Sequence, residues 1–264
     1  MKMVKPKKSL GQNFLVDKNI INIITEAGNI NKNDTVLEIG PGTGNLTEKI
    51  LNKIPKKFFV IEKDKNLAKK LEEKFKKKLF IINEDVLKVD EKKLSNEPMI
   101  VFGNLPYNIS TQILVKWIRF KNLNKTFKKF ILMFQKEVAD RIIATTNEKK
   151  YGRLSILSSW RMNIKKVADV SPYSFYPIPK VKSTILLIEP KVEYFSFKNS
   201  KNLEHITNIF FNQRRKKIKK PLKFLFKDVN EISKKLNINI DNRPQNLSTS
   251  KYIEICNEYE KLVP

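Results

Sequence analysis

Polar side chains follow three successive apolar runs of the sequence, and their types suit one kind of ligand. The segment VLEIGPGTGNLTEKI carries Gly40, Gly42 and Gly44 between an apolar run and a helical pattern. Such a turn lets the backbone approach a ligand closely, and the helix N-terminus offers unpaired N–H groups. Glu62 ends the next apolar run, where a carboxylate can accept both hydroxyls of a ribose. Asp85 follows the third run and can accept from an adenine amino group. Together these positions indicate a site for an adenosine-containing ligand.

The glycine-rich turn differs from the dinucleotide-binding fingerprint at one position. That fingerprint has a further glycine at position 45, where this chain has Asn45. A solvated charge at a strand end is the structural alternative for Glu62, because Lys63 and Asp64 follow it directly. The interpretation therefore depends on all three strand ends facing one crevice.

A fourth apolar run ends in an unusual way, in the sequence VFGNLPYNIS at residues 101–110. The run itself is typical of a buried strand, but the tetrapeptide NLPY has no hydrophobic period. Pro106 fixes its own φ angle and favours an extended conformation for Leu105. Asn104 could instead have only a structural role, as the cap of the helix that follows.

Apolar runs alternate with helical patterns over most of the chain. We expect strands at residues 35–40, 57–64, 79–87, 99–107, 128–135 and 183–190, and helices at 45–54, 66–78, 111–120 and 136–144. Strands separated by helices predict βαβ units and a parallel sheet, with the carboxyl ends of the strands facing one crevice. After residue 191 helical spacing continues without a strand signal, which predicts a main domain over 1–190 and a small helical domain over 191–264.

The chain is strongly basic. Its 264 residues include 53 Lys and Arg against 27 Asp and Glu, a formal net charge of +26. This balance favours a polyanionic partner such as a nucleic acid, because each neutralised phosphate releases counterions. Only seven of the basic residues are arginine, so an AT-rich coding bias toward lysine is the alternative explanation.

Composition also excludes several classes of protein. A single cysteine, Cys256, rules out an internal disulfide, and with a single histidine we expect no structural zinc site. No apolar run approaches the roughly 18 residues of a membrane span, and the lysine-rich N-terminus has no apolar stretch of a secretory signal. We therefore expect a cytoplasmic protein that uses no metal and contacts no membrane.

Four segments resemble motifs of a known family. KKSLGQNFL, EIGPGTGNLT, NLPY and SFYPIPKVKS are similar to those of the small-subunit (16S) rRNA adenine N6-dimethyltransferase family, and the similarity extends from Lys7 to RPQNLSTSKYIEICN. The resemblance implies an α/β fold, namely a class I (Rossmann-like) S-adenosylmethionine-dependent methyltransferase domain over 1–190 and a helical rRNA-binding domain over 191–264. The implied reaction dimethylates N6 of two adjacent adenines in a loop near the 3′ end of small-subunit rRNA during ribosome assembly. S-adenosyl-L-homocysteine is the other product.

The resemblance also implies which residues contact the methyl donor. Glu38 would help to orient the methionine amine. The implied contacts to S-adenosylmethionine are Asn13, Leu15, Gly40, Gly42, Glu62, Asp85, Val86 and Asn104.

For the acceptor, the resemblance implies that NLPY holds an adenine. The Asn104 oxygen and the Leu105 carbonyl would both accept from N6, turning its delocalised lone pair toward the methyl group. Pro106 would hold the Leu105 carbonyl outward, Tyr107 would stack on the base, and Phe175 resembles the family's second stacking ring. No strong general base is required, so positioning and electrostatics carry the catalysis. Ordinary half-buried aromatic residues are the structural alternative for both rings.

Two basic stretches are candidates for RNA contact. Lys7 and Lys8 lie beside the GQNFL motif, and QRRKKIKKPLKFLFK carries eight basic residues without an acid. A solvated helical face is the structural alternative, whereas the resemblance implies that the helical domain grips rRNA, with a loop base flipped into the pocket. The partner would be the pre-30S particle, and we expect a monomer. In the second stretch the predicted contacts are Arg214, Arg215, Lys216, Lys217, Lys219 and Lys220.

Other functions remain open at this point. The related large-subunit rRNA methyltransferases of the macrolide-resistance type usually read N-I-P-Y, whereas this chain has NLPY. DNA adenine and protein glutamine methyltransferases more often show N-P-P-Y or D-P-P-Y and lack the GQNFL opening. A catalytically silent ribosome-assembly factor on the same fold is a further alternative, although Glu62, Asp85 and Asn104 are all present.

Overall fold

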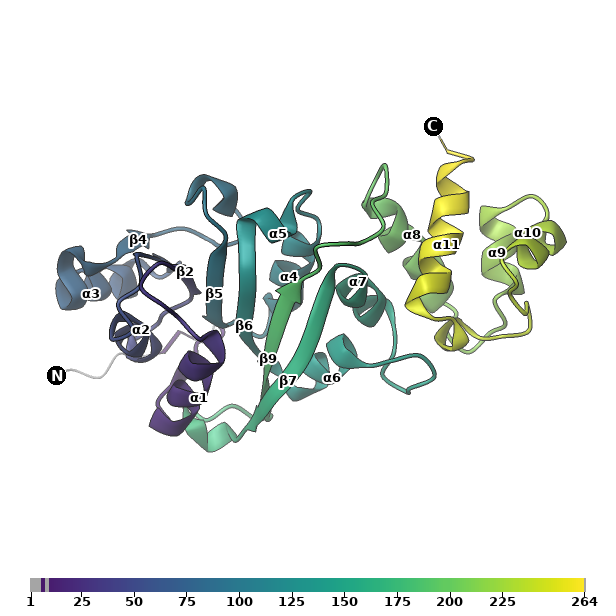
Figure 1. Cartoon of the computed structure of the whole chain (residues 1–264). Helices are drawn as coiled ribbons and strands as arrows, with labels where there is room; N and C mark the ends of the chain where they lie inside the picture. Colours follow the sequence, from purple (N-terminus) through teal and green to yellow (C-terminus); the bar gives the residue numbers. More distant parts are fainter. Residues whose placement is uncertain (1–5, 8–9, 264) are drawn as a thin grey trace. The chain divides into compact units, whose positions relative to one another are not determined.

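The chain forms two compact units in the computed structural model, which describes residues 6–7 and 10–263 (Figure 1). The first unit contains the described part of Met1–Ala139 together with Asn163–Pro190. The second contains Asp140–Met162 and the described part of Lys191–Pro264. The predicted boundary at 190 and 191 is one of the places where the chain passes between units, but residues 140–162 group with the helical unit instead of the main one.

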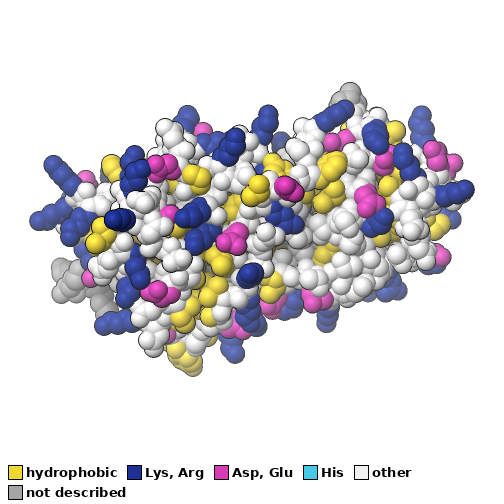
Figure 2. Space-filling view, in the orientation of Figure 1, with side chains coloured by type: hydrophobic (Ala, Val, Ile, Leu, Met, Phe, Trp, Pro, Cys, Tyr) yellow, Lys and Arg dark blue, Asp and Glu magenta, His cyan; other side chains and the backbone are white. Residues whose placement is uncertain are grey.

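Basic side chains cover the visible surface broadly. In Figure 2, Lys and Arg are spread over the whole face with acidic side chains among them, rather than gathered in one patch. None of the described helices is long and apolar enough to cross a membrane.

The first unit is built on a mixed sheet whose described strands have the order β4-β3-β2-β5-β6-β9-β7. The pairs from β4 to β6 are parallel, and β9 runs antiparallel to β6. The chain builds outward from β2 through β3 to β4 and then returns to β5, so the strand order reverses between β2 and β5. Ligands of open α/β sheets bind at the carboxyl ends of strands beside such a reversal. The strands are β2 (Thr35–Ile39), β3 (Lys57–Ile61), β4 (Phe80–Ile82), β5 (Met99–Asn104), β6 (Phe127–Gln135), β7 (Met162–Val170) and β9 (Ser183–Pro190).

Two strand features were not predicted. The period of β7 is interrupted by Asn163, Lys165 and Lys166, and much of that strand is exposed or half-buried. A separate two-stranded sheet pairs β1 (Phe14–Leu15) with β8 (Phe175–Tyr176), and two residues are too few to give a periodic signal. The predicted late strand is present as β9, but its antiparallel direction makes the sheet mixed rather than wholly parallel.

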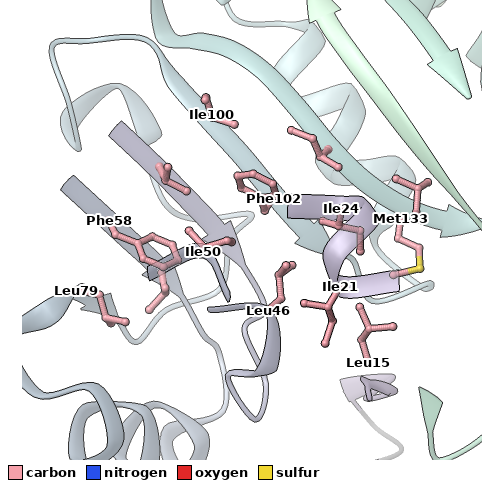
Figure 3. Close-up of a cluster of buried hydrophobic side chains, with 14 of the residues drawn as sticks. Leu15, Ile21, Ile24, Leu46, Ile50, Phe58, Leu79, Ile100, Phe102 and Met133 are labelled. Atoms are coloured by element: carbon pink, nitrogen blue, oxygen red, sulfur yellow. The ribbon is translucent and has the colours of Figure 1, made fainter. Parts of the chain in front are cut away.

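The helices of the first unit bury apolar faces against this sheet. Figure 3 shows Ile21 and Ile24 of α1 and Leu46 and Ile50 of α2 gathered with Phe102 of β5 in one buried cluster. Each such side chain stabilises the fold by roughly 1.5–3 kcal/mol. The helices are α1 (Lys18–Gly28), α2 (Asn45–Leu51), α3 (Lys65–Phe75), α4 (Ser110–Ile118), α5 (Leu123–Thr126) and α6 (Lys136–Ile143), which crosses into the second unit, with short 3₁₀ turns at Lys76–Lys78, Glu91–Lys93 and Pro172–Ser174.

The second unit is helical, as predicted for the C-terminal part of the chain. Both α7 and α11 pack on α8, which explains why residues 140–162 join this unit. The buried Tyr252 of α11 sets its ring edge against Phe210 of α8 at 5.3 Å between centroids, and its hydroxyl donates to the Pro244 carbonyl at 2.8 Å. The elements are α7 (Arg153–Arg161), α8 (Lys201–Phe211), α9 (Lys219–Leu225), α10 (Val229–Lys235), a 3₁₀ turn at Pro244–Asn246 and α11 (Thr249–Glu260).

Candidate active site

A cavity lies where the carboxyl ends of β2, β3 and β5 meet the loop after β4 and the segment 10–15. It therefore occupies the edge of the sheet at which the strand order reverses. Nearly all of the predicted donor and acceptor residues line it. These are Asn13, Leu15, Glu38, Gly40, Gly42, Glu62, Asp85, Val86, Asn104, Leu105, Pro106 and Tyr107.

The glycine-rich turn presents its backbone to this cavity. Gly40 has φ +65° and no heavy atom within 4 Å of the place where a Cβ would stand, so its side faces open space. Gly42 has φ +58°, and a Cβ there would come within 2.8 Å of Phe14 Cδ1. Both glycines thus occupy the left-handed region that other residues adopt only with strain. The turn leaves room for a ligand at Gly40 and closes against β1 at Gly42.

Glu62 has its carboxylate fixed by the backbone. Oε2 accepts from the N–H of Gly42 at 3.2 Å, and Oε1 accepts from the N–H of Asp64 at 2.8 Å. Burial raises the pKa of Glu62, and these two backbone hydrogen bonds oppose that effect. Each carboxylate oxygen keeps a lone pair, so the group can still accept from two neighbouring hydroxyls.

Glu38 of β2 also lines the cavity and is almost completely buried. The Thr47 hydroxyl donates to its Oε2 at 2.7 Å. Burial raises the pKa of Glu38 to about 8, helped by the nearby charge of Glu62 and opposed by the Thr47 bond. At neutral pH this side chain is therefore mostly protonated and adds little charge to the cavity.

Asp85, in the loop after β4, is held as an ionised carboxylate in the cavity lining. Its hydrogen bond with the Lys63 ammonium, 2.8 Å from Oδ2, lowers its pKa, and the N–H of Leu87 donates to Oδ1 at 2.9 Å. Because Lys63 is largely exposed while Asp85 is mostly buried, the lysine can move aside without unfolding anything.

Hydrogen bonds and an ion pair from α4 hold the loop that follows Asp85. Lys116 of α4 donates to the Val86 and Val89 carbonyls at 2.6 Å and to both oxygens of Glu91 at 2.9 and 2.8 Å. Trp117 Nε1 donates to Glu91 Oε1 at 2.8 Å. Helix α4, which follows NLPY, therefore also fixes the loop that carries Asp85 and Val86.

Asn104 has its amide turned in one direction. Its Nδ2 donates to the Asn13 carbonyl at 2.8 Å, and its Oδ1 accepts from no residue that the structure describes. The structural alternative for this residue, a helix cap, is wrong, because α4 begins at Ser110 after Ile109 and without a side-chain cap. The amide oxygen of Asn104 is therefore available to a ligand.

Tyr107 is anchored at its hydroxyl. The hydroxyl lies 2.6 Å from Ser183 Oγ at the start of β9, and burial raises the pKa of the tyrosine. Because the Tyr107 hydroxyl is held by Ser183 and its pKa is raised, it stays protonated at neutral pH and does not act as a base. The ring can serve as a stacking surface.

Comparisons with known proteins identify the family of this chain. The family model for ribosomal RNA adenine dimethylase matches residues 3–261. The chain belongs to the ribosomal RNA adenine dimethylase family. A Pelagibacter ubique relative named ribosomal RNA small subunit methyltransferase A is 54% identical over 98% of this chain and 98% of its own length. An Ehrlichia ruminantium relative of the same name is 42% identical over 97% of each chain.

Solved structures show the same fold over nearly the whole dimethylase chain. A dimethyladenosine transferase from Plasmodium falciparum has a TM-score of 0.81 at 27% identity, covering 94% of this chain and 98% of its own. The 23S rRNA methyltransferase ErmE has a TM-score of 0.71 at 22% identity, covering 94% and 100%, and it shows the fold alone. The predicted family and the predicted class I methyltransferase fold are confirmed.

One predicted residue of this dimethylase does not line the cavity. Phe175 is only 2% exposed and belongs to the buried cluster of the first unit, with its backbone paired to Leu15. Successive residues of a strand face opposite sides, so the exposed ring of β8 is Tyr176 instead. In this structure the Phe175 ring fills the core and is not exposed for the predicted stacking contact.

The predicted basic contacts behave in different ways. Lys7 pairs with the buried Asp64 at 2.9 Å, and Lys8 lies outside the described residues. Arg214 is tied to its own unit, donating to Gln245 Oε1 at 3.2 Å and to the carbonyls of Glu148 and Lys149. Lys217 pairs with Asp241 at 2.8 Å on the surface.

The other basic residues of the second stretch are exposed, and the stretch does not form one helix. Residues 212–218 form turns between α8 and α9. Arg214 is therefore better explained as a structural residue than as a free cation. The exposed cations of the stretch are Arg215, Lys216, Lys217, Lys219, Lys220, Lys223 and Lys227.

Several residues of the site were missed by sequence reasoning. Thr47 hydrogen-bonds the Glu38 side chain, and Ser183 hydrogen-bonds the Tyr107 hydroxyl. Asn45 donates from Nδ2 to the Leu15 carbonyl at 2.8 Å. Asn45 stands where the dinucleotide fingerprint has glycine, which is a signal that could have identified it. No group of three or more His, Cys, Asp or Glu within the described residues could hold a metal ion.

Proposed function

We propose that this dimethylase transfers methyl groups from S-adenosylmethionine to N6 of two adjacent adenines in a loop near the 3′ end of small-subunit rRNA, giving N6,N6-dimethyladenosine during ribosome assembly. The observation that carries the proposal is the Asn104 amide, whose nitrogen is held by Asn13 while its oxygen is available beside a cavity with adenosine-type acceptors. The small-subunit names of the curated relatives support the choice of rRNA.

The residues of the cavity fit the methyl donor. The open space at Gly40 can admit the methionine part, Glu62 can accept from the ribose hydroxyls, and Asp85 with Val86 can hold the adenine. Asn13 and Leu15 would complete this site from segment 10–15. Bound there, the donor supplies a methyl group on a positively charged sulfur. Ionised Asp85 and the Glu62 carboxylate suit that positive charge.

The acceptor adenine would be held by NLPY. The Asn104 amide oxygen and the Leu105 carbonyl accept the two N–H bonds of N6, which pulls the nitrogen out of conjugation and aims its lone pair. Pro106 keeps the Leu105 carbonyl extended, and Tyr107 stacks on the base with its hydroxyl fixed by Ser183. No side chain needs to remove the proton first, because the methylated nitrogen is acidic and releases it to solvent.

Phe175 stays a prediction within this proposal. Stacking by its ring requires the segment around β8 to move, since the ring is buried in this structure.

The exposed cations Arg215, Lys216, Lys219 and Lys220 would contact phosphates of the pre-30S particle. We further propose that the enzyme is cytoplasmic and acts as a monomer.

Mapping of transferred methyl groups tests the proposal. Unmodified small and large ribosomal subunits are incubated separately with the protein and isotope-labelled donor, and rRNA fragments are analysed by mass spectrometry. We expect N6,N6-dimethyladenosine at two adjacent adenines of small-subunit rRNA. Label only in large-subunit rRNA would favour the macrolide-resistance type of enzyme. Donor binding without any label would favour an assembly factor that lacks catalysis.

Asn104→Ala tests the role of the amide. Removing the oxygen that polarises N6 should lower the rate of methyl transfer by about 100- to 1,000-fold, as loss of one preorganised polar group does. Donor binding, measured by calorimetry, should weaken but remain detectable. Asn96→Ala, on an exposed loop, is the matched control and should leave both values unchanged. Turnover of Asn104→Ala at the wild-type rate would remove this residue from the mechanism.

A further inference from the structure

A second concave surface lies on the helical unit, between the C-terminal end of α8 and α9. Ile209 and Gln213 of the α8 side and Lys220, Pro221, Lys223 and Phe224 of α9 line this groove. Phe224 is 73% exposed, and its ring packs on no other aromatic ring of the described chain. Because most of the Phe224 ring is exposed to water, its apolar surface is available to a binding partner.

Folding of α9 does not need this ring. The helix buries Pro221, Leu222 and Leu225 on its inner side, whereas Lys223 and Phe224 face outward. Substitution of Phe224 therefore tests binding without removing a core contact.

The charges around the ring are all of one sign. Lys220 and Lys223 are exposed, and neither forms an ion pair with another described residue. No acidic side chain lines the groove within the described part of the chain. A groove with a flat aromatic ring and two unpaired ammonium groups complements an anion that also carries an aromatic face.

We propose that this groove, the Phe224 groove, binds an unpaired nucleotide of the RNA substrate. The base stacks on the Phe224 ring, Lys220 and Lys223 contact its flanking phosphates, and Gln213 can hydrogen-bond a base edge. The inference rests on the proposed function, because it takes RNA as the substrate. It adds a contact to a base, whereas the basic residues of 215–220 predict contacts only to phosphates.

A tryptophan reporter tests the groove directly. Trp117 and Trp160 are buried, so in a Phe224→Trp variant the indole at 224 is the exposed one among the described residues. A short single-stranded oligoadenylate should quench its fluorescence, and an abasic ribose phosphate chain of equal length should not.

Affinity measurements give the matched comparison. Phe224→Ala should weaken binding of the oligoadenylate by about 5- to 150-fold, the range expected for loss of one stacked base. Its affinity for the abasic chain should not change. Leu262→Ala, another exposed apolar residue of the same unit, and Lys201→Ala, an exposed lysine outside the groove and the basic stretch, are the controls.

Several results would overturn the inference. Equal quenching by both chains, or wild-type oligoadenylate affinity in Phe224→Ala, shows that no base stacks there. A change in sedimentation of Phe224→Ala, with RNA affinity unchanged, identifies a second copy of the chain as the occupant. If Phe224→Ala loses affinity for small subunits but keeps its affinity for oligoadenylate, the occupant of the groove is a protein. Methyl transfer by the wild-type protein, measured in parallel, separates failure of the groove from failure of the proposed function.

Discussion

At the scale of single residues, the site depends on polar groups whose partners fix their direction. The Asn104 amide is turned by Asn13, Tyr107 is held by Ser183, and Glu38 is bonded by Thr47. The resemblance to the motifs of a known family identified Asn104, Tyr107 and Glu38, whereas Glu62 and Asp85 were identified because each follows an apolar run. Neither signal identified their partners, since Thr47 and Ser183 occupy positions at which many residues would fit the pattern.

The protonation of Glu38 predicts how stability depends on pH. The pKa of Glu38 is about 8 in the fold against 4.5 for an ordinary glutamate, so the folded state binds more protons between these values. Stability should therefore fall as pH rises through this window, at up to about 1.4 kcal/mol per pH unit from this group. Glu38→Gln removes that loss, so the variant should gain stability relative to wild type from about pH 5 to about pH 8.

Urea unfolding at several pH values checks this expectation. Glu73→Gln, at an exposed position of α3, serves as the control and should follow the wild-type curve. Parallel curves for Glu38→Gln and wild type would show that Glu38 is ionised in the folded state at neutral pH.

At the scale of elements, the alternating strands and helices could be predicted because buried parallel strands are continuous apolar runs. Two features could not. The motif around Phe175 specifies residue types, but only the pairing of β8 with β1 decides that Phe175 faces the core and Tyr176 faces out. Lys116 lies in a helical pattern, where a lysine is normally solvated, and only the fold brings Glu91 to it.

Lys116→Met tests the link between α4 and the loop that carries Asp85 and Val86. Glu91 is fully buried, so the variant removes the ammonium that pairs with it and leaves only the Trp117 hydrogen bond, at a cost of about 3–5 kcal/mol. The double variant Lys116→Met with Glu91→Gln should recover much of that loss, since glutamine still accepts from Trp117. Donor affinity should weaken in the single variant, because Val86 and Val89 lose their hydrogen bonds.

Chemical unfolding and donor calorimetry measure these two effects. Lys93→Met, at an exposed position on the same loop, is the control. Unchanged stability of Lys116→Met would mean that Glu91 does not depend on the lysine as its partner, and unchanged affinity for the methyl donor would show that the network does not act on the cavity.

At the scale of the whole molecule, the formal net charge is +26, and on the face shown in Figure 2 the basic side chains are spread out rather than confined to one patch. The sequence alone could not separate cations that bind phosphate from those that support the fold. The structure makes one such distinction, because Arg214 is bonded to carbonyl groups of its own unit.

Neutralising the exposed cations tests their contact with RNA. Replacement of Arg215, Lys216, Lys219 and Lys220 by glutamine should flatten the dependence of small-subunit affinity on salt, by up to about 0.7–0.9 in the logarithmic slope per lost phosphate contact. The same change at four exposed lysines of α3 and the turn after it, Lys69, Lys70, Lys77 and Lys78, should alter the slope less. Equal slopes for the two variants would indicate that general charge, and not this stretch, attracts the RNA.

The bond between Asn13 and Asn104 joins two functions to one short peptide. Residues 13 to 15 help to form the wall that would receive the donor, and the carbonyl of Asn13 also sets the direction of the amide that would receive the adenine. Loosening that peptide would leave the sheet intact and yet impair both halves of the reaction at once. Donor affinity and acceptor alignment are therefore not independent traits in this enzyme, and a change that relaxes one is expected to relax the other.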